Sequence, residues 1–122
     1  MTRKECNGYF TKELKANGGF TVDHSFDSPK KGYMVGFKSL FVLPNVQSLL
    51  SEKYLMLTLI VQELATPNKD LFLGGWIDEE SGKVYIDISE NFINKDEALK
   101  VAKERGKLAI YSLQFDESIY VD

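Results

Sequence analysis

His24 is the only histidine of the chain, and it lies next to Asp23 and close to Asp27. A histidine beside a carboxylate can act as a general base when a nucleophile or a substrate lies within reach. Serine, histidine and aspartate are all present, but no Gly-x-Ser-x-Gly motif marks a nucleophile. Because a turn histidine at the surface is the commoner case, we predict no catalytic residue.

The acidic run Asp78-Glu79-Glu80 gathers hard oxygen ligands without the alternating spacing of a calcium loop. The charged tip of a hairpin explains it better. Gly82-Lys83 is similar to the end of a phosphate loop, yet Val84 follows where serine or threonine is needed. The single cysteine, Cys6, can form neither an internal disulfide nor a cysteine-based zinc site. We therefore expect no metal and no cofactor.

An aromatic pair is the best candidate for binding. Two β-rich runs flank a Glu-Glu-Ser-Gly turn, and the residues on either side of this turn are expected to pair in a hairpin. The resulting register puts Trp76 beside Tyr85 and Gly74 beside Asp87 on one face. The other face is aliphatic and is the expected core, with Ile77 paired to Val84, Gly75 to Ile86 and Leu73 to Ile88.

Exposed tryptophan and tyrosine side chains often anchor interfaces, because they offer a large rigid area at small entropic cost. We therefore predict a partner-binding site of six residues around the hairpin: Trp76, Tyr85, Asp87, Lys83, Glu79 and Glu80. The alternative buries both rings in a second small core under the N-terminal segment or the C-terminal strand. Gly74-Gly75 within a strand predicts a close approach by another element, most simply a helix packed over the sheet.

The elements that carry these residues indicate an α+β fold. Residues 1–18 are polar with two Asn-Gly steps, and we expect a flexible arm, either loose or a short helix before a turn. Residues 19–122 form the predicted single domain, in the order ββαββαβ. This order predicts a twisted, mainly antiparallel sheet of about five strands with two helices packed on one face. Its expected elements are strands at 19–23 and 33–43, a helix at 46–65, the hairpin at 71–89, a helix between Asn94 and Gly106, a strand at 107–115 and a short edge at 118–121.

The helix expected at 46–65 has one apolar stripe, made of Val46, Leu49, Leu50, Leu57, Ile60, Val61 and Leu64. Leu55, Met56 and Leu59 lie off this stripe, so they are candidate contacts of a homodimer, with a monomer as the alternative. In the later helix, Asn94 and Glu97 have the spacing of a capping box. The strand at 107–115 is apolar on both alternations, which favours a central place in the sheet.

Charge and hydropathy favour a cytoplasmic protein. Fifteen Lys and Arg against eighteen Asp and Glu give a net charge of −3, without the basic surplus of a duplex-binding domain. The polar start has no secretory signal, and no apolar run approaches the ~20 residues of a transmembrane helix. We expect no membrane contact, and binding to nucleic acid is possible but not favoured.

Four segments resemble a small module of phage and plasmid proteins: GYMVG at 32–36, LGGWID at 73–78, GKVYIDIS at 82–89 and AIY at 109–111. The resemblance spans about residues 19–115 and implies an origin in a mobile element. Small proteins of such elements often inhibit host defence, as anti-CRISPR and anti-restriction proteins do. The resemblance therefore implies a non-enzymatic protein that binds and inhibits a bacterial defence nuclease, such as a CRISPR-Cas effector.

Two other classes of function stay open. One is a small hydrolase or transferase that uses Asp87, His24 or Tyr33, although no catalytic constellation supports it. The other is a nucleic-acid-binding accessory domain that uses the N-terminal lysines and aromatic residues.

Overall fold

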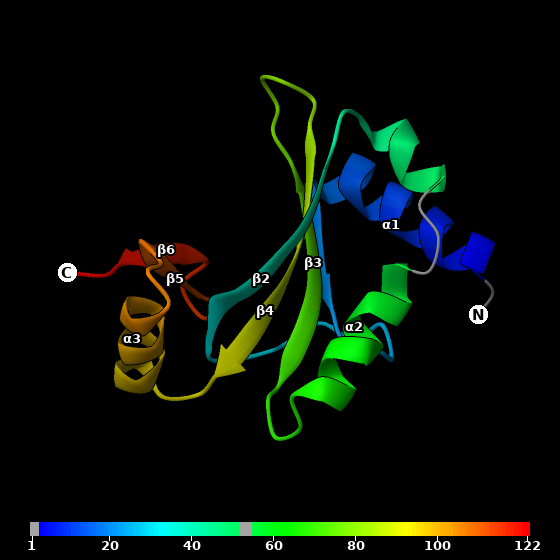
Figure 1. The fold of residues 1–122 in the computed structure, drawn as a ribbon. Helices are drawn as coiled ribbons and strands as arrows, with labels where there is room; N and C mark the ends of the chain where they lie inside the picture. Colours follow the sequence, from blue (N-terminus) through cyan, green and yellow to red (C-terminus); the bar gives the residue numbers. More distant parts are fainter. Residues whose placement is uncertain (1–2, 52–54) are drawn as a thin grey trace.

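The chain folds into one antiparallel sheet with helices packed against it (Figure 1). The computed structural model describes the backbone of residues 3–51 and 55–122, and the side chains of 8–48 and 55–122. The elements are α1 (Arg3–Asn17), β1 (Gly19–Val22), β2 (Tyr33–Leu43), the 3-10 helix η1 (Val46–Ser51), α2 (Leu55–Ala65), β3 (Leu71–Ile77), β4 (Val84–Phe92), α3 (Lys95–Glu104), β5 (Ala109–Ser112) and β6 (Glu117–Tyr120). The α+β class is confirmed, with six strands in the order β1-β3-β4-β2-β5-β6 where about five were expected.

The β3–β4 hairpin has the predicted register. Trp76 pairs with Tyr85 and Gly74 with Asp87. The turn is closed by the amide of Asp78, which donates to the Lys83 carbonyl at 2.9 Å, and Gly82 adopts a φ of 75° that favours glycine. The turn residues and the alternation of apolar and polar side chains along the two strands therefore predict this register, because both act between residues close in the chain.

Over the residues that the structure describes, the helices pack on one face of the sheet. Leu73, Val84, Ile86 and Ile88 are at most 1% exposed and form the first core cluster with α1 and α2. Val35, Ala98, Ala102 and Ile110 form a second cluster under α3. The two clusters share a face, because Val35 pairs with Glu90 and Glu90 alternates in phase with Ile88 along β4. In Figure 1, α1 and α2 cover one end of this face and α3 covers the other.

The N-terminal segment is part of the domain. The sequence predicts either a loose arm or a short helix for this segment, and the structure has a helix, α1. Phe10 is 0% exposed and Leu14 is 2% exposed, both within the first cluster. The Phe10 ring stacks on Phe20 of β1 with 4.5 Å between ring centroids. The expected division into an arm at 1–18 and a domain from 19 is therefore not seen in the packing.

The orientation expected for the long helix is wrong. Residues 46–65 do not form one helix, since η1 ends at Ser51 and α2 begins at Leu55, with 52–54 outside the described residues. In α2, Leu55 and Leu59 are 2% and 0% exposed and Met56 packs against the same core, so Leu55 and Leu59 are not available as dimer contacts. The exposed side of α2 carries four residues of the expected inner stripe: Leu57, Ile60, Val61 and Leu64. Both sides of α2 are apolar, so local periodicity could not choose between them.

The C-terminal strand is shorter and less central than expected. β5 covers Ala109–Ser112 only, and Leu108 is 82% exposed. The amide of Lys107 donates to the Ala102 carbonyl, so the end of α3 takes up the residues before the strand. β5 pairs with β2 only at Tyr33 and Met34, so in the described part of the chain the later half of β2 has a neighbour on one side alone.

The third helix matches its sequence signals. Asn94 is the N-cap of α3 and its side chain accepts from the Glu97 amide at 2.9 Å. Ala98 and Ala102 are fully buried, and Gly106 has a φ of 70°. Over the residues described, no helix is both long enough and apolar enough to cross a membrane.

Candidate functional site

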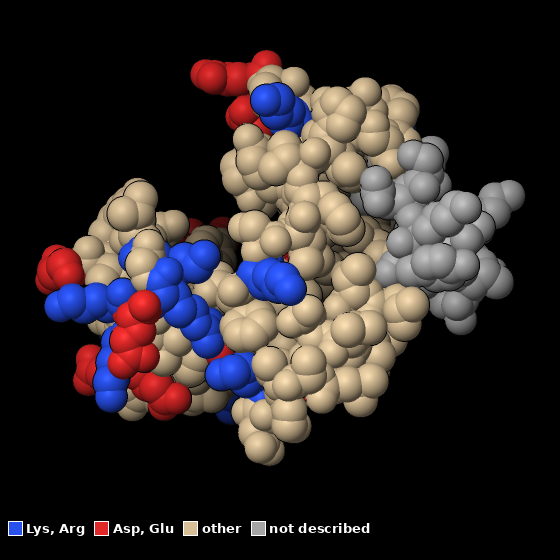
Figure 2. All heavy atoms as spheres, in the orientation of Figure 1, with Lys and Arg blue, Asp and Glu red and all other residues tan. Residues whose placement is uncertain are grey.

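The face of the sheet that carries no helix, here called the open face, is concave. A groove of about 800 Å³ runs across it, lined by residues of all six strands together with Tyr9, Glu13 and Asn17 of α1. Figure 2 shows the molecule hollowed between the tip of the β3–β4 hairpin and the β5–β6 end. The residues of this groove that matter below are Met34, Gly36, Gly74, Trp76, Asp87 and Tyr111.

An aromatic row forms the wall of the open face nearest the hairpin tip. Trp76, Tyr85 and Val42 are neighbours on β3, β4 and β2. The Trp76 and Tyr85 rings stack with 4.5 Å between centroids and 11° between planes. Trp76 is 48% exposed and Val42 is 57% exposed. The alternative of a second closed core around the two rings is therefore excluded.

Glycines form the floor of the groove. A Cβ on Gly74 would lie 2.6 Å from Oδ1 of Asp87, so the carboxylate occupies the space that a side chain would fill. A Cβ on Gly36 would lie 3.1 Å from Cε of Lys107, which places that lysine over β2. Gly75 faces the other way, under the Phe20 ring. The close approach predicted for the Gly74-Gly75 step is thus made by side chains and not by a helix.

Asp87 carries the unusual electrostatics of the groove. Burial raises its pKa to about 6, and the positive charge of Lys107 opposes this rise. No salt bridge joins Asp87 to Lys107, and no group among the described residues donates a hydrogen bond to the Asp87 carboxylate. A partly desolvated carboxylate without a partner is unfavourable, since burial removes water that the charge would otherwise hold. The Asp87 carboxylate can therefore accept a hydrogen bond from a group that enters the groove.

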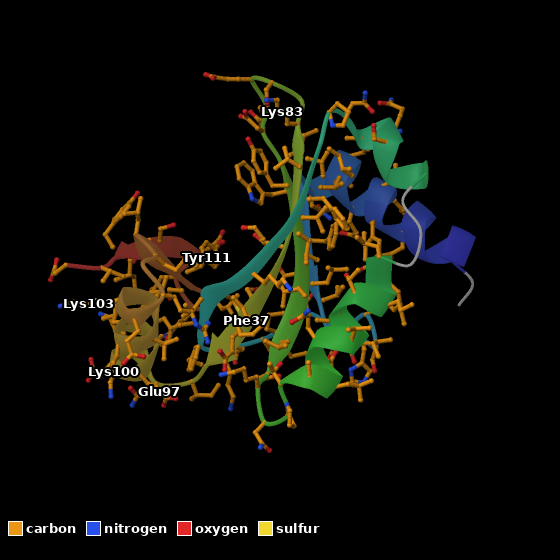
Figure 3. All side chains as sticks on the ribbon, viewed as in Figure 1. Phe37, Lys83, Glu97, Lys100, Lys103 and Tyr111 are labelled. Carbon is orange, nitrogen blue, oxygen red and sulfur yellow. The ribbon has the colours of Figure 1, made fainter. Side chains whose placement is uncertain are left out.

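The hairpin tip lies beyond the groove. Glu79, Glu80 and Lys83 are exposed there, and Figure 3 shows Lys83 at the tip and Tyr111 at the β5 side of the hollow. The hydroxyl of Ser81 donates to the Asp78 carboxylate at 2.7 Å and lowers the pKa of that carboxyl. The acidic run expected to form a charged tip therefore does so, and its two glutamates extend the rim of the open face.

The residues considered for catalysis are not brought together. Nδ1 of His24 lies 3.1 Å from Oε2 of Glu63 on α2. Tyr33 packs on the helix side, in the second cluster, while Asp87 lies on the open face. Among the described residues, no three His, Cys, Asp or Glu side chains form a group that could hold a metal. Cys6 belongs to the residues whose side chains are not described.

Sequence reasoning missed the part of the groove that β2 and β5 contribute. Met34, Gly36, Lys107 and Tyr111 are far from the hairpin in the chain, and only the strand order brings them beside Asp87. The four sequence segments at 32–36, 73–78, 82–89 and 109–111 each supply residues to this groove. Met34 and Gly36 come from the first segment, Gly74 and Trp76 from the second, Asp87 from the third and Tyr111 from the fourth.

Comparison with known proteins identifies no relative: no family model, no curated protein and no solved structure matches the chain.

Proposed function

We propose that this protein is a non-enzymatic binding protein that takes a protein partner on its open face. The observation that carries the proposal is the stacked pair of Trp76 and Tyr85, which lies half-exposed beside an uncovered groove. Rigid aromatic side chains next to a concave surface are typical of the residues that anchor protein interfaces. Their stacking holds both rings in place before binding, so little side-chain entropy is lost on association.

The proposed partner is a bacterial defence nuclease, such as a CRISPR-Cas effector, and the proposed effect is inhibition. Two features support this choice. The chain resembles modules of mobile elements, and the rim of the open face carries the exposed acids Glu79 and Glu80, which would complement a basic nucleic-acid channel. A net charge of −3 is small, so steric blocking with aromatic anchoring contributes more than charge mimicry. Such a partner would place the protein in the bacterial cytoplasm.

The test is co-purification with a panel of CRISPR effectors and restriction nucleases, together with cleavage assays. Trp76→Ala should lower affinity by about a hundredfold, since an anchor of this kind is worth about 2–4 kcal/mol. Leu64→Ala is the matched control, because Leu64 is 79% exposed but lies on α2, on the other side of the sheet. Equal loss in both variants, or no loss in either, would exclude the open face as the docking surface. Capture of none of the nucleases would contradict nuclease inhibition.

A small hydrolase or transferase is the second candidate, and one observation favours it. Asp87 has a pKa raised to about 6 within a groove, as a general acid or base often has. The absence of His24 and Tyr33 from the open face speaks against it. Asp87→Asn separates the two candidates. An enzyme would lose its biological effect while partner binding persists, whereas a docking protein would lose or keep both together.

A further inference from the structure

On the helix side of the sheet, a cation lies between a carboxylate and an aromatic ring, and the open face carries a carboxylate and an aromatic ring of the same kind. On the helix side, Nη2 of Arg105 lies 2.5 Å from Oε1 of Glu90. The same guanidinium lies 5.1 Å from the centre of the Phe37 ring. Figure 3 shows Phe37 between α3 and α2, where this contact is made. A cation is thus held between a carboxylate and an aromatic ring.

The carboxylate and the aromatic ring recur on the open face, where the nearby cation, Lys107, forms no salt bridge with the carboxylate. Asp87 and Trp76 line the same groove, and Trp76 stacks on Tyr85, the residue of β4 two positions before Asp87. Ring faces attract cations within about 6 Å of their centres, and arginine does so most often. We infer that the groove receives a cationic side chain of the partner, a guanidinium or an ammonium group, between the Asp87 carboxylate and the Trp76 wall. This inference rests on the proposed docking at the open face.

The shape of the floor supports this assignment. Gly74 lets the Asp87 carboxylate lie across β3, where a Cβ would be 2.6 Å from Oδ1. The carboxylate is therefore held low in the groove, and the space above it is free between Trp76 and Tyr111. A long, flexible basic side chain suits such a depth, because its stem packs against apolar walls while its charged end reaches the floor.

The charge balance of the groove supports the same assignment. Asp87 is partly desolvated and unpaired, and Lys107 is the charged residue that acts on its pKa. Lys107 lies over Gly36 and forms no salt bridge with Asp87. Pairing with an incoming cation would offset the cost of burying the carboxylate, and the positive charge of Lys107, which forms no salt bridge with Asp87, only partly opposes this attraction. The partner's inserted residue is accordingly basic and not acidic.

The experiment uses two small probes, N-acetyl-arginine amide and its neutral analogue N-acetyl-citrulline amide. Trp76 is the only tryptophan, so its fluorescence reports the groove directly, and NMR chemical shifts give the residues affected. The arginine probe should perturb Trp76 and its neighbours and should bind at least about tenfold more tightly than the citrulline probe. Equal responses to the two probes, or no response to arginine, would overturn the inference. This comparison uses the unaltered protein.

Variants locate the contact. Asp87→Asn should remove the preference for arginine, while Glu104→Gln, at an exposed carboxylate of α3 on the helix side, should keep it. Thermal unfolding of each variant checks that it is folded. Different results would contradict the docking proposal and the inferred cationic contact. If Trp76→Ala abolishes capture of the partner while Asp87→Asn leaves both capture and the arginine preference unchanged, the docking face stands and the cationic contact is wrong.

Discussion

Asp87 and Gly74 depend on each other. The carboxylate lies where a Cβ of residue 74 would be, and no donor among the described residues compensates its burial. A protein normally avoids such a desolvated charge unless a bound partner satisfies it. Burial of the Asp87 carboxylate therefore lowers the stability of the isolated fold. A bound partner that pairs with the carboxylate would offset this loss.

This cost predicts a particular dependence of stability on pH. The folded state raises the pKa of Asp87 from 3.8 to about 6, so it binds a proton more tightly than the unfolded chain does. The stabilising contribution of the protonated carboxyl is fully present below pH 3.8 and is lost as the pH rises through about 6. Asp87→Asn should therefore be more stable than the parent protein at pH 8, by at most about 3 kcal/mol. The two proteins should become similar near pH 4.

Urea unfolding from pH 4 to pH 8 measures this difference. Glu79→Gln serves as control, because that carboxylate is exposed and should change stability little at any pH. A constant difference between Asp87→Asn and the parent across the range would show that the carboxyl is not desolvated.

At the scale of the elements, local signals explain the hairpin and α3 but not α2. The β3–β4 register and the Asn94 cap depend on residues within a few positions of each other, so the sequence predicts them. The orientation of α2 depends on how its inner side meets the sheet, and both sides are apolar. Periodicity then indicates a helix without indicating which side is buried.

Two matched variants test the orientation of α2. Leu59→Ala should lower the free energy of unfolding by about 2–5 kcal/mol, because it leaves a cavity in the first core cluster. Leu64→Ala, on the exposed side, should change it by less than about 0.5 kcal/mol. The reverse order of the two effects in urea unfolding would mean that the helix is turned by half a rotation.

At the scale of the whole molecule, one-sided packing produces the groove. Over the described residues, the three α-helices pack on the helix side, and only α1 reaches the lining of the groove, with Tyr9, Glu13 and Asn17. Figure 2 shows charged side chains gathered over α3 and at the hairpin tip, with few over α2. The groove, the aromatic row and the acidic rim therefore share one side of the sheet, which leaves this side accessible to a partner.

The packing of α1 is tested at the same scale. Phe10→Ala should lower the free energy of unfolding by about 3–5 kcal/mol, since the ring is 0% exposed and stacks on Phe20. Lys12→Ala, at an exposed position of the same helix, provides the control. A negligible effect of Phe10→Ala would indicate that α1 is a separate arm, as the polar composition of residues 1–18 suggests.

The sequence by itself determined the α+β class, the bounds of β2, the hairpin register with Trp76 beside Tyr85, and the cap of α3. Only the tertiary structure decided that Leu59 is buried and Leu64 exposed, that α1 joins the core, and that Gly36, Lys107 and Tyr111 surround the groove of Asp87. The physical reason is the distance along the chain over which each feature is set. Turns, caps and alternation act between near neighbours, whereas the groove depends on the strand order β1-β3-β4-β2-β5-β6, which joins distant segments.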